Sequence, residues 1–137
     1  MGQTIDPKGT VTKTWYDDQG RSRFVTSNWK NFNGDRSTAT GKYTGGGSDK
    51  SEDATVLTVF NGLGAVKELI ALDKDGNGNQ TDNEVTKYYY QDSYNASLLT
   101  HTVYPDSISV WSSGDDKVTM TYHLDGTVQT TLCGEAF

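Results

Sequence analysis

One stretch of the sequence has the residue types and spacing of a calcium-binding loop. Residues 73–84, DKDGNGNQTDNE, match the pattern D-x-[DN]-x-[DN]-G-x5-E in every required position. Calcium prefers oxygen ligands from carboxylates, amides, carbonyls and water. The candidate ligands are the side chains of Asp73, Asp75, Asn77 and Glu84, the backbone carbonyl of Asn79 and a water held by Thr81. Calcium is therefore a candidate cofactor.

The residues that follow this loop leave a second interpretation open. An EF-hand has a helix on each side of its loop, whereas residues 84–90, EVTKYYY, have the composition of a strand. A loop framed by strands would bind calcium more weakly than an EF-hand. The alternative is a turn between hairpins, rich in Asp, Asn and Gly, that binds no metal.

The other reactive residues do not fall into a known catalytic spacing. The histidines, His101 and His123, are expected at the surface or rim of strands, and no Ser lies in a G-x-S-x-G elbow. The single cysteine, Cys133, excludes an intrachain disulfide and is expected to be a buried small hydrophobe or an incidental thiol. Adjacent acids such as Asp17 and Asp18 are expected to face solvent in turns. We therefore predict no catalytic residues and no enzyme activity.

Two tryptophans are candidates for binding a carbohydrate. The flat face of an exposed Trp matches the apolar face of a sugar ring, and Trp29 and Trp111 are the candidates. Trp29 lies in SNWKNFNG, among Asn, Lys and Gly, so we expect it to be the most exposed of the three Trp residues. The alternative is that these rings fill the space between hairpins.

The composition favours strands and argues against two kinds of partner. The 137 residues include 8 Tyr, 3 Trp and 15 Gly but only 2 Pro, a balance typical of β-structure with many turns. The net charge is -6 and no basic cluster occurs, so we expect no nucleic-acid partner. No apolar run reaches the length of a membrane-spanning helix, so we expect no membrane insertion.

A short pattern recurs along the chain: an aromatic residue, three further residues and a Gly. Residues 13–27, KTWYDDQGRSRFVTS, predict a strand, a tight turn and a second strand around its first copy. A degenerate copy begins at Tyr90, where Asn95 could take the left-handed conformation that Gly usually fills. The residue three positions past each Gly is polar, namely Arg23, Lys67 and Gln129. The residues of the repeated unit are Tyr16 and Gly20, Phe60 and Gly64, Tyr90, and Tyr122 and Gly126.

Periodicity identifies further strands and one long loop. Residues 65–72, AVKELIAL, are short and follow two Gly residues, so we expect a strand there. Residues 118–122 and 128–132 alternate around Asp125-Gly126, which predicts a hairpin with one apolar face formed by Val118, Met120, Tyr122, Val128, Thr130 and Leu132. Residues 34–54 have no usable period and are predicted to form a flexible loop rich in Gly, Ser and Asp.

Each hairpin is too small to bury its own face, so neighbouring hairpins must share a core. We expect the aromatic residue before each turn to face that core and to pack on the ring of the adjacent unit. The Gly lets the chain reverse, and Asp17 caps the turn backbone through its carboxylate. The sequence therefore predicts one all-β domain over residues 1–137, in which antiparallel hairpin repeats form a curved or closed sheet.

These repeated units resemble the YD repeats of the RHS family. The matching segments are TWYDDQGRSRFVT, TVFNGLGAVKELIALDKDGNGN and TYHLDGTVQT, within residues 10–26 and 56–132. Only the first copy has the Tyr-Asp pair itself, at Tyr16-Asp17. The resemblance implies a strip of antiparallel hairpins that can spiral into a shell, with no catalytic residues in the repeat. It also implies a large bacterial cell-surface or secreted protein, of which this chain is a fragment or derivative.

The resulting functional expectation is a non-enzymatic structural repeat module that acts as scaffold, shell or adhesive surface. The alternative is a calcium-assisted or carbohydrate-binding module that uses residues 73–84 and the exposed rings, with glycans as ligands. The start of the sequence, MGQTIDPKG, is not a secretion signal, so such a location needs a leader outside this sequence. Two open sheet edges predict self-association, or capping of an edge by residues 34–53.

Overall fold

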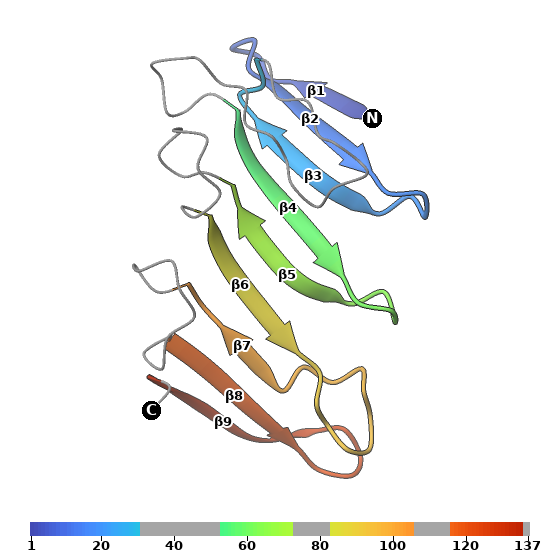
Figure 1. Cartoon of the computed structure of the whole chain (residues 1–137), viewed down its shortest axis with the longest axis vertical. Helices are drawn as coiled ribbons and strands as arrows, with labels where there is room; N and C mark the ends of the chain where they lie inside the picture. The colour runs from blue at the N-terminus through green and yellow to red at the C-terminus, as the bar shows by residue number, and fades with distance from the viewer. Residues whose placement is uncertain (31–52, 73–82, 106–115, 136–137) are drawn as a thin grey trace. The chain divides into compact units, whose positions relative to one another are not determined.

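The computed structural model describes residues 1–30, 53–72, 83–105 and 116–135, and these contain nine strands and no helix. No helix that could span a membrane is therefore found in this part of the chain. The strands are β1 (Gly2–Ile5), β2 (Val11–Tyr16), β3 (Ser22–Ser27), β4 (Ala54–Phe60), β5 (Val66–Ala71), β6 (Glu84–Tyr89), β7 (His101–Val103), β8 (Asp116–Tyr122) and β9 (Val128–Glu135) (Figure 1).

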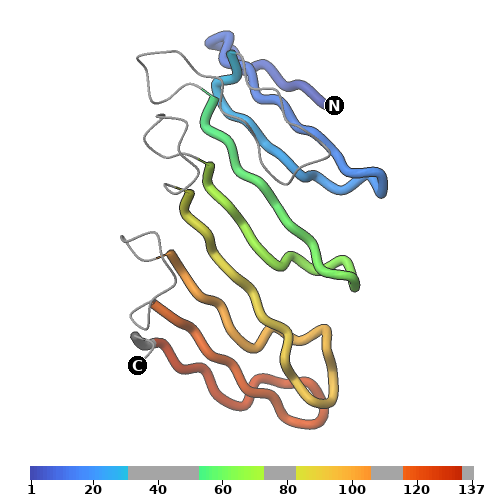
Figure 2. Tube along the Cα trace, viewed as in Figure 1, coloured from blue at the N-terminus to red at the C-terminus, as the bar shows by residue number. Residues whose placement is uncertain are grey.

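The strands form one antiparallel sheet whose order in space is their order in the sequence, from β1 to β9. The predicted all-β class with antiparallel hairpins is confirmed. The sheet is open, because β1 and β9 stand at the two ends of this order, so the closed alternative is wrong. Figure 2 traces the tight reversals that join β1 to β2, β2 to β3 and β8 to β9.

Several strands lie where periodicity predicts them. β2 and β3 flank the turn at residues 17–21, and β5 lies within residues 65–72, where a strand is predicted. β6 begins at Glu84, the last residue of the candidate calcium loop, and β8 and β9 form the predicted C-terminal hairpin. β-Branched and aromatic side chains dominate these segments, and a pleated sheet accommodates such side chains well.

The chain divides into two compact units. Unit 1 comprises Met1–Val59 and Ile70–Glu84, and unit 2 comprises Phe60–Leu69 and Val85–Phe137. The core of unit 1 is a row of three residues on adjacent strands, because Trp15 lies opposite Phe24 and Phe24 lies opposite Leu57. Four partly buried residues pack against this row, namely Trp29, Val59, Ile70 and Leu72.

The buried face of unit 1 is not the face that carries the repeated aromatic residue. Trp15 is 8% exposed whereas Tyr16, the next residue, is 38% exposed. Successive side chains of a strand point to opposite faces, so burying Trp15 directs Tyr16 outward. The prediction that Tyr16 faces the core is therefore wrong.

Buried threonines extend this core by pairing with each other. Thr26 and Thr55 lie directly opposite, and their hydroxyl oxygens are 2.9 Å apart. The Thr55 hydroxyl donates to the Asp53 carbonyl at 2.8 Å, so Thr26 is the donor in the pair. Within the described residues no buried side-chain nitrogen or oxygen lacks a hydrogen-bond partner. Hydrogen bonding thus removes the main cost of burying these hydroxyls.

The C-terminal hairpin does not have the single apolar face predicted for it. Val118 and Met120 lie opposite Cys133 and Thr131, whereas Leu132 lies opposite Thr119. A β-bulge causes this difference: Tyr122 pairs with Val128 but Thr121 pairs with Thr130, so one strand carries an additional residue at Gln129. The additional residue shifts the alternation by one and moves Thr130 and Leu132 to the other face.

Most of the predicted loop of residues 34–54 lies outside the described residues, but its C-terminal end is described. Asp53 is buried, with 3% exposure, and its backbone N–H donates to the Asn28 carbonyl at 3.0 Å. The Asp53 carboxylate accepts the backbone N–H of Lys30 at 2.7 Å. The two ends of the connection between β3 and β4 are therefore tied together.

Candidate functional site

The most regular local feature of the described residues is a five-residue turn that occurs there four times, at residues 6–10, 17–21, 61–65 and 123–127. In each, the first residue donates its N–H to the carbonyl of the fifth, and the fourth donates to the carbonyl of the first. The donor–acceptor distances lie between 2.8 and 3.1 Å. This pattern is that of a hairpin loop of three residues, which places its last loop residue in the left-handed conformation.

The fourth position of each turn requires Gly. Gly9, Gly20, Gly64 and Gly126 have φ angles of 82°, 79°, 83° and 85°, a region that side chains with a Cβ atom rarely adopt. The three Gly residues of the repeated unit thus adopt the conformation that the motif requires. Steric crowding is not the reason for Gly at this position, because a Cβ on Gly20 or Gly126 would contact nothing within 4 Å.

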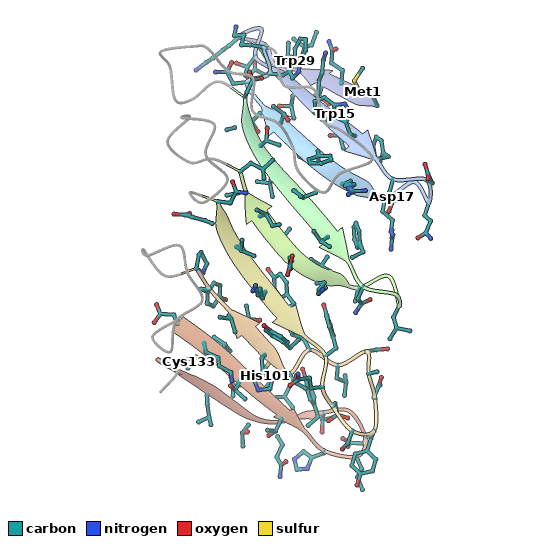
Figure 3. All side chains as sticks on the ribbon, viewed as in Figure 1. Met1, Trp15, Asp17, Trp29, His101 and Cys133 are labelled. Carbon is teal, nitrogen blue, oxygen red and sulfur yellow. The ribbon has the colours of Figure 1, made fainter. Side chains whose placement is uncertain are left out.

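The first position of three of these turns carries a side chain that caps the loop. Asp6, Asp17 and Asn61 each accept the backbone N–H groups of the third and fifth residues through Oδ1, at 2.8 to 3.0 Å. Asp17 also accepts from Arg21 Nε through Oδ2 at 2.7 Å (labelled in Figure 3). These bonds satisfy the loop amides and stiffen the turn.

The fourth copy uses a different residue for the same purpose. His123 occupies its first position, and the cap comes instead from Asp125, whose Oδ1 accepts the Thr127 N–H at 2.9 Å and the Thr127 hydroxyl at 2.6 Å. These bonds from Thr127 lower the pKa of Asp125. A carboxylate therefore fixes this turn as well, from the third position rather than the first.

The Asp17 carboxylate is stabilised in its charged form. Partial burial raises the pKa of Asp17, but the backbone N–H of Arg21, the Arg21 side chain and the Gln19 N–H outweigh it. The net result is a pKa below the ordinary value of 3.8. The structure-forming role predicted for Asp17 as a turn cap agrees with these contacts.

Sequence analysis missed the copy at residues 6–10. This turn follows Ile5, so the search for an aromatic residue followed by Gly passed over it. The signal that would have found it is Asp or Asn followed three residues later by Gly, which Asp6-Pro7-Lys8-Gly9 satisfies. The capped turn is therefore a better definition of the repeated unit than the ring that precedes it.

The copy at Tyr90 differs from the prediction. The positive-φ residues other than Gly in the described part of the chain are Asn28 and Asp53, so Asn95 does not take the left-handed conformation expected of it. Asn95 instead resembles a first-position residue: its Oδ1 accepts the Ser97 N–H at 2.9 Å and its carbonyl accepts the Leu98 N–H at 3.1 Å. The connection between β6 and β7 is accordingly longer and lacks the Gly.

The aromatic residue of the repeated unit reaches back to the preceding strand. Tyr90 follows β6 and donates its hydroxyl to the carbonyl of Val66, the first residue of β5, at 2.8 Å. Tyr122 ends β8 and donates its hydroxyl to the Leu99 carbonyl, just before β7. Each tyrosine thereby ties the end of one strand to the start of its neighbour.

Tyr16 makes the corresponding contact at the N-terminal end of unit 1. It ends β2, and its ring lies over Gly2 at the start of β1, where an added Cβ would be 3.2 Å from the Tyr16 Oη. The contacts of Tyr16, Tyr90 and Tyr122 are thus with neighbouring backbone, whereas the sequence predicts packing on the ring of the adjacent unit. Backbone is present in every neighbour, so this contact does not need a matching aromatic partner.

In two of the hairpins the polar residue three positions past the Gly has a defined structural place. In the β2–β3 pair, Tyr16 lies opposite Ser22 and Trp15 lies opposite Phe24, so Arg23 is the additional residue of a β-bulge. Gln129 is the additional residue in the β8–β9 pair. In both hairpins the bulge lies directly across from the tyrosine. A bulge increases the local twist of the strand, and here it also reverses which face the following residues occupy.

The two histidines lie in different elements. His101 is the first residue of β7, and His123 is the first residue of the turn at residues 123–127. His101 is half-buried, its Nδ1 is 2.9 Å from the Thr100 hydroxyl, and its ring meets Tyr89 edge-on at a centroid distance of 6.3 Å. Burial, followed by the nearby Lys117, lowers the pKa of His101. His101 is therefore neutral at pH 7 and makes structural contacts, whereas His123 is exposed in its turn.

The Trp29 ring is not the exposed platform expected from the sequence. Trp29 packs partly against the core of unit 1, and its backbone N–H donates to the Val11 carbonyl at 2.8 Å (Figure 3). The Lys13 ammonium lies 3.0 Å from the ring centroid, over one face. A sugar could stack on that face only by displacing Lys13. The second candidate, Trp111, lies outside the described residues.

The candidate calcium loop lies almost wholly outside the described residues. Asp73, Asp75, Asn77, Asn79 and Thr81 are not described, and Glu84 is the first residue of β6. Among the residues that the structure does describe, no group of three or more His, Cys, Asp or Glu side chains could hold a metal ion. Calcium binding at residues 73–84 therefore stays a prediction.

Cys133 is exposed on β9, so of its two predicted alternatives the buried small hydrophobe is wrong, whereas an incidental thiol agrees with this exposure. Comparison with known proteins adds nothing to these observations. No protein-family model matches the sequence, and a search of curated proteins gives no significant match.

Proposed function

We propose that the chain is a non-enzymatic structural module of β-hairpin repeats from a cell-surface or secreted bacterial protein similar to RHS proteins. Its role is that of a scaffold, shell or adhesive surface. The resemblance of the repeated unit to YD repeats supports the location and the parent protein, and the contacts described above support the mechanical role.

The recurrence of one closed turn carries this proposal. Four turns share the same two backbone bonds and the same left-handed Gly, although their sequences have little else in common. Loops that serve a binding or catalytic site are usually shaped individually for that site. Repetition of one turn instead builds a strip in which each hairpin presents its neighbour with the same edge.

Pairing between sequence neighbours supports the same proposal. Each strand of the sheet lies next to the strands that precede and follow it in the chain. Repeat proteins have this property, and their length can grow by adding units without rearranging the existing ones. The contacts of Tyr90 with Val66 and of Tyr122 with Leu99 join each strand to its predecessor and need no distant partner.

Extension of the chain tests the proposal directly. A second copy of residues 104–135 added after residue 135 supplies a connection and one more hairpin like β8–β9. In a repeat module this hairpin folds onto β9, and the urea m value rises because more surface is exposed on unfolding. A scrambled copy of the same 104–135 segment is the matched control. An unchanged m value, with the added segment unprotected from hydrogen exchange, would contradict the proposal.

The alternative is a calcium-assisted or carbohydrate-binding module. A glycan array probed with the full chain, with calcium and with chelator, separates the two functions, because a scaffold gives no signal. If a signal appears and Trp29→Ala abolishes it, the alternative is correct. Thermal melts with millimolar calcium or chelator test the loop itself, because a bound ion must raise the midpoint by mass action.

A further inference from the structure

The turn at residues 61–65 contains a reactive pair of residues that the other three turns of its kind lack. Its first residue is Asn61 and the next is Gly62. The backbone nitrogen that follows an Asn can attack the side-chain amide carbon of that Asn, which closes a succinimide ring and releases ammonia. A side chain on the following residue hinders this attack, and Gly has none. Asn61 and Gly62 therefore have the types and the order needed for spontaneous deamidation.

The attacking nitrogen of this turn is accessible. No described residue accepts the Gly62 N–H, and Gly62 is exposed with nothing within 4 Å of an added Cβ. Two of the other turns differ in this group. Asp6 is followed by Pro7, which has no N–H, and the Gly126 N–H donates to the His123 carbonyl at 2.9 Å. Among the four turns, the one at residues 61–65 thus combines an Asn with a free nucleophile.

The cap of this turn places two donors on the oxygen where negative charge develops. The Asn61 Oδ1 accepts the backbone N–H groups of Leu63 and Ala65, both at 3.0 Å. Two N–H donors identify this atom as the amide oxygen, so the cap does not hold the Nδ2 group. When the Gly62 nitrogen attacks Cγ, negative charge collects on Oδ1, and donors at this distance stabilise such a charge. The hydrogen bonds that cap the turn therefore also favour the attack.

We propose that Asn61 is a site of spontaneous deamidation in the folded chain, assisted by the cap of its own turn. A base from the solvent, hydroxide or a buffer anion, removes the Gly62 N–H proton. The nitrogen then forms a bond to Cγ, the bond between Cγ and Nδ2 breaks, and Nδ2 takes a proton from water and leaves as ammonia. Water opens the succinimide at either carbonyl, which gives Asp at position 61 or its isoaspartyl isomer. The proposal does not rest on the structural role proposed above.

The two products differ in their effect on the turn. Asp at position 61 would match Asp6 and Asp17, whose Oδ1 atoms accept the amides of the third and fifth turn residues. The isoaspartyl product instead brings Cβ and Cγ into the main chain and lengthens it by one carbon atom, which separates the cap from those amides. Both products add one negative charge. Deamidation therefore either preserves or opens the turn between β4 and β5.

Peptide mapping by mass spectrometry of the full chain, incubated at mildly alkaline pH, tests the site. We expect Asn61 to gain the mass of one deamidation, at a rate that rises with pH because the nucleophile must lose a proton. The Asn–Gly pairs at residues 33–34 and 77–78 lie outside the described residues and are followed in separate peptides. Gly62→Ala is the matched variant, and its methyl group should slow the reaction roughly tenfold or more. An unmodified Asn61, or an equal rate in Gly62→Ala, would contradict the proposal.

Unfolding separates the contribution of the turn from that of the dipeptide. In guanidinium chloride the Asn–Gly pair is unchanged, but the Leu63 and Ala65 donors are no longer held on Oδ1. We expect deamidation of Asn61 to be severalfold slower in the unfolded chain than in the folded chain at the same pH. An equal or faster rate in the unfolded chain would show that the cap gives no assistance and would overturn that part of the proposal.

Transfer of the pair to another capped turn tests the same geometry independently. Asp17→Asn combined with Asp18→Gly creates an Asn–Gly pair in the turn at residues 17–21, whose first residue has the same two amide bonds. We expect deamidation there at a rate similar to that of Asn61. Asp6→Asn is the control, because Pro7 has no N–H and the ring cannot close. No reaction in the double variant, with a near-UV circular dichroism spectrum that shows a retained fold, would contradict the proposal. Equal reaction in Asp6→Asn would indicate direct hydrolysis instead of ring closure.

Discussion

At the scale of single residues, a small set of polar atoms holds the hairpins in place. The Oδ1 atoms of Asp6, Asp17 and Asn61 each accept two backbone amides of their turn, and Asp125 in the last turn accepts one backbone amide and the Thr127 hydroxyl. The hydroxyls of Tyr90 and Tyr122 bond to a carbonyl on the preceding strand. The caps act within a single turn, whereas the tyrosine bonds join residues 24 and 23 positions apart in the sequence.

Protonation of the turn carboxylates should make the fold sensitive to acid. The pKa values of Asp17 and Asp125 are lowered below 3.8, so the stability that they contribute is fully present above the unfolded-state pKa. That stability is lost as the pH falls through the lower, folded-state pKa values. Urea unfolding between pH 6 and 2 should therefore show a decline below pH 4 that is smaller in Asp17→Asn. An identical pH profile in that variant would contradict the assigned cap.

The tyrosine that ends β8 should stabilise the chain mainly through its hydroxyl. Tyr122→Phe keeps the ring but leaves the Leu99 carbonyl without this donor, and we expect a loss of about 0.5–1.5 kcal/mol in the free energy of unfolding. Tyr94→Phe is the control, because Tyr94 is 80% exposed and should change stability by less than about 0.5 kcal/mol. Equal effects in urea denaturation would show that the hydroxyl contact is unimportant.

At the scale of elements, the hairpin loop with its left-handed Gly is the unit that recurs, and two of these hairpins, β2–β3 and β8–β9, add a bulge. Tyr16 and Tyr122 each lie across from a bulge, at Arg23 and Gln129 respectively. A strand with one additional residue exchanges its inner and outer faces beyond that point. The pattern of apolar residues on the second strand of such a hairpin therefore cannot be aligned with the first by alternation alone.

Two substitutions show whether the turn needs Gly for its left-handed backbone conformation or for lack of space around the residue. Gly126 has a φ of 85° with no atom within 4 Å of an added Cβ, so Gly126→Ala should cost about 1–2 kcal/mol through the backbone alone. Gly62 also has an open surrounding but no positive φ. Gly62→Ala should be neutral or stabilise by up to about 1 kcal/mol. Urea denaturation of both variants checks the difference, and a cost for Gly62→Ala similar to that for Gly126→Ala would refute it.

At the scale of the whole molecule, the strand order limits how far a local defect can spread. Among the described strands each has only its sequence neighbours beside it, and the core row of Trp15, Phe24 and Leu57 belongs to unit 1. In an array of this kind, stability is approximately a sum of unit terms and nearest-neighbour terms. A change in one unit should therefore weaken that unit more than distant hairpins.

Leu57→Ala tests this localisation. Leu57 is fully buried, so its truncation should cost about 2–5 kcal/mol, whereas Val56→Ala on the same strand, 41% exposed, should cost less than about 1 kcal/mol. Hydrogen exchange of the full chain should show faster opening of β2, β3 and β4 in Leu57→Ala. β8 and β9 should keep their protection. Equal acceleration throughout the chain would indicate a single cooperative unit instead.

The amino-acid sequence by itself determined the features that depend on neighbouring residues. Alternation and residue composition predicted β2, β3, β8 and β9, the short run after two Gly residues predicted β5, and Gly20, Gly64 and Gly126 predicted the reversals that follow β2, β4 and β8. Such features need only the local preferences of φ and ψ and the hydrogen-bonding range of a short side chain. The Asp-x-x-Gly at residues 6–9 was equally readable, but a pattern built on aromatic residues overlooked it.

Only the tertiary structure decided which face of each strand is buried and what the aromatic residues contact. The choice of Trp15 over Tyr16 for the core depends on strands distant in sequence, and a bulge at Gln129 moves Leu132 to the opposite face from Met120. The half-burial of Trp29 likewise depends on Lys13 and on the core of unit 1. Burial is a collective property of adjacent strands, so one additional residue in a ladder can reverse what local periodicity predicts.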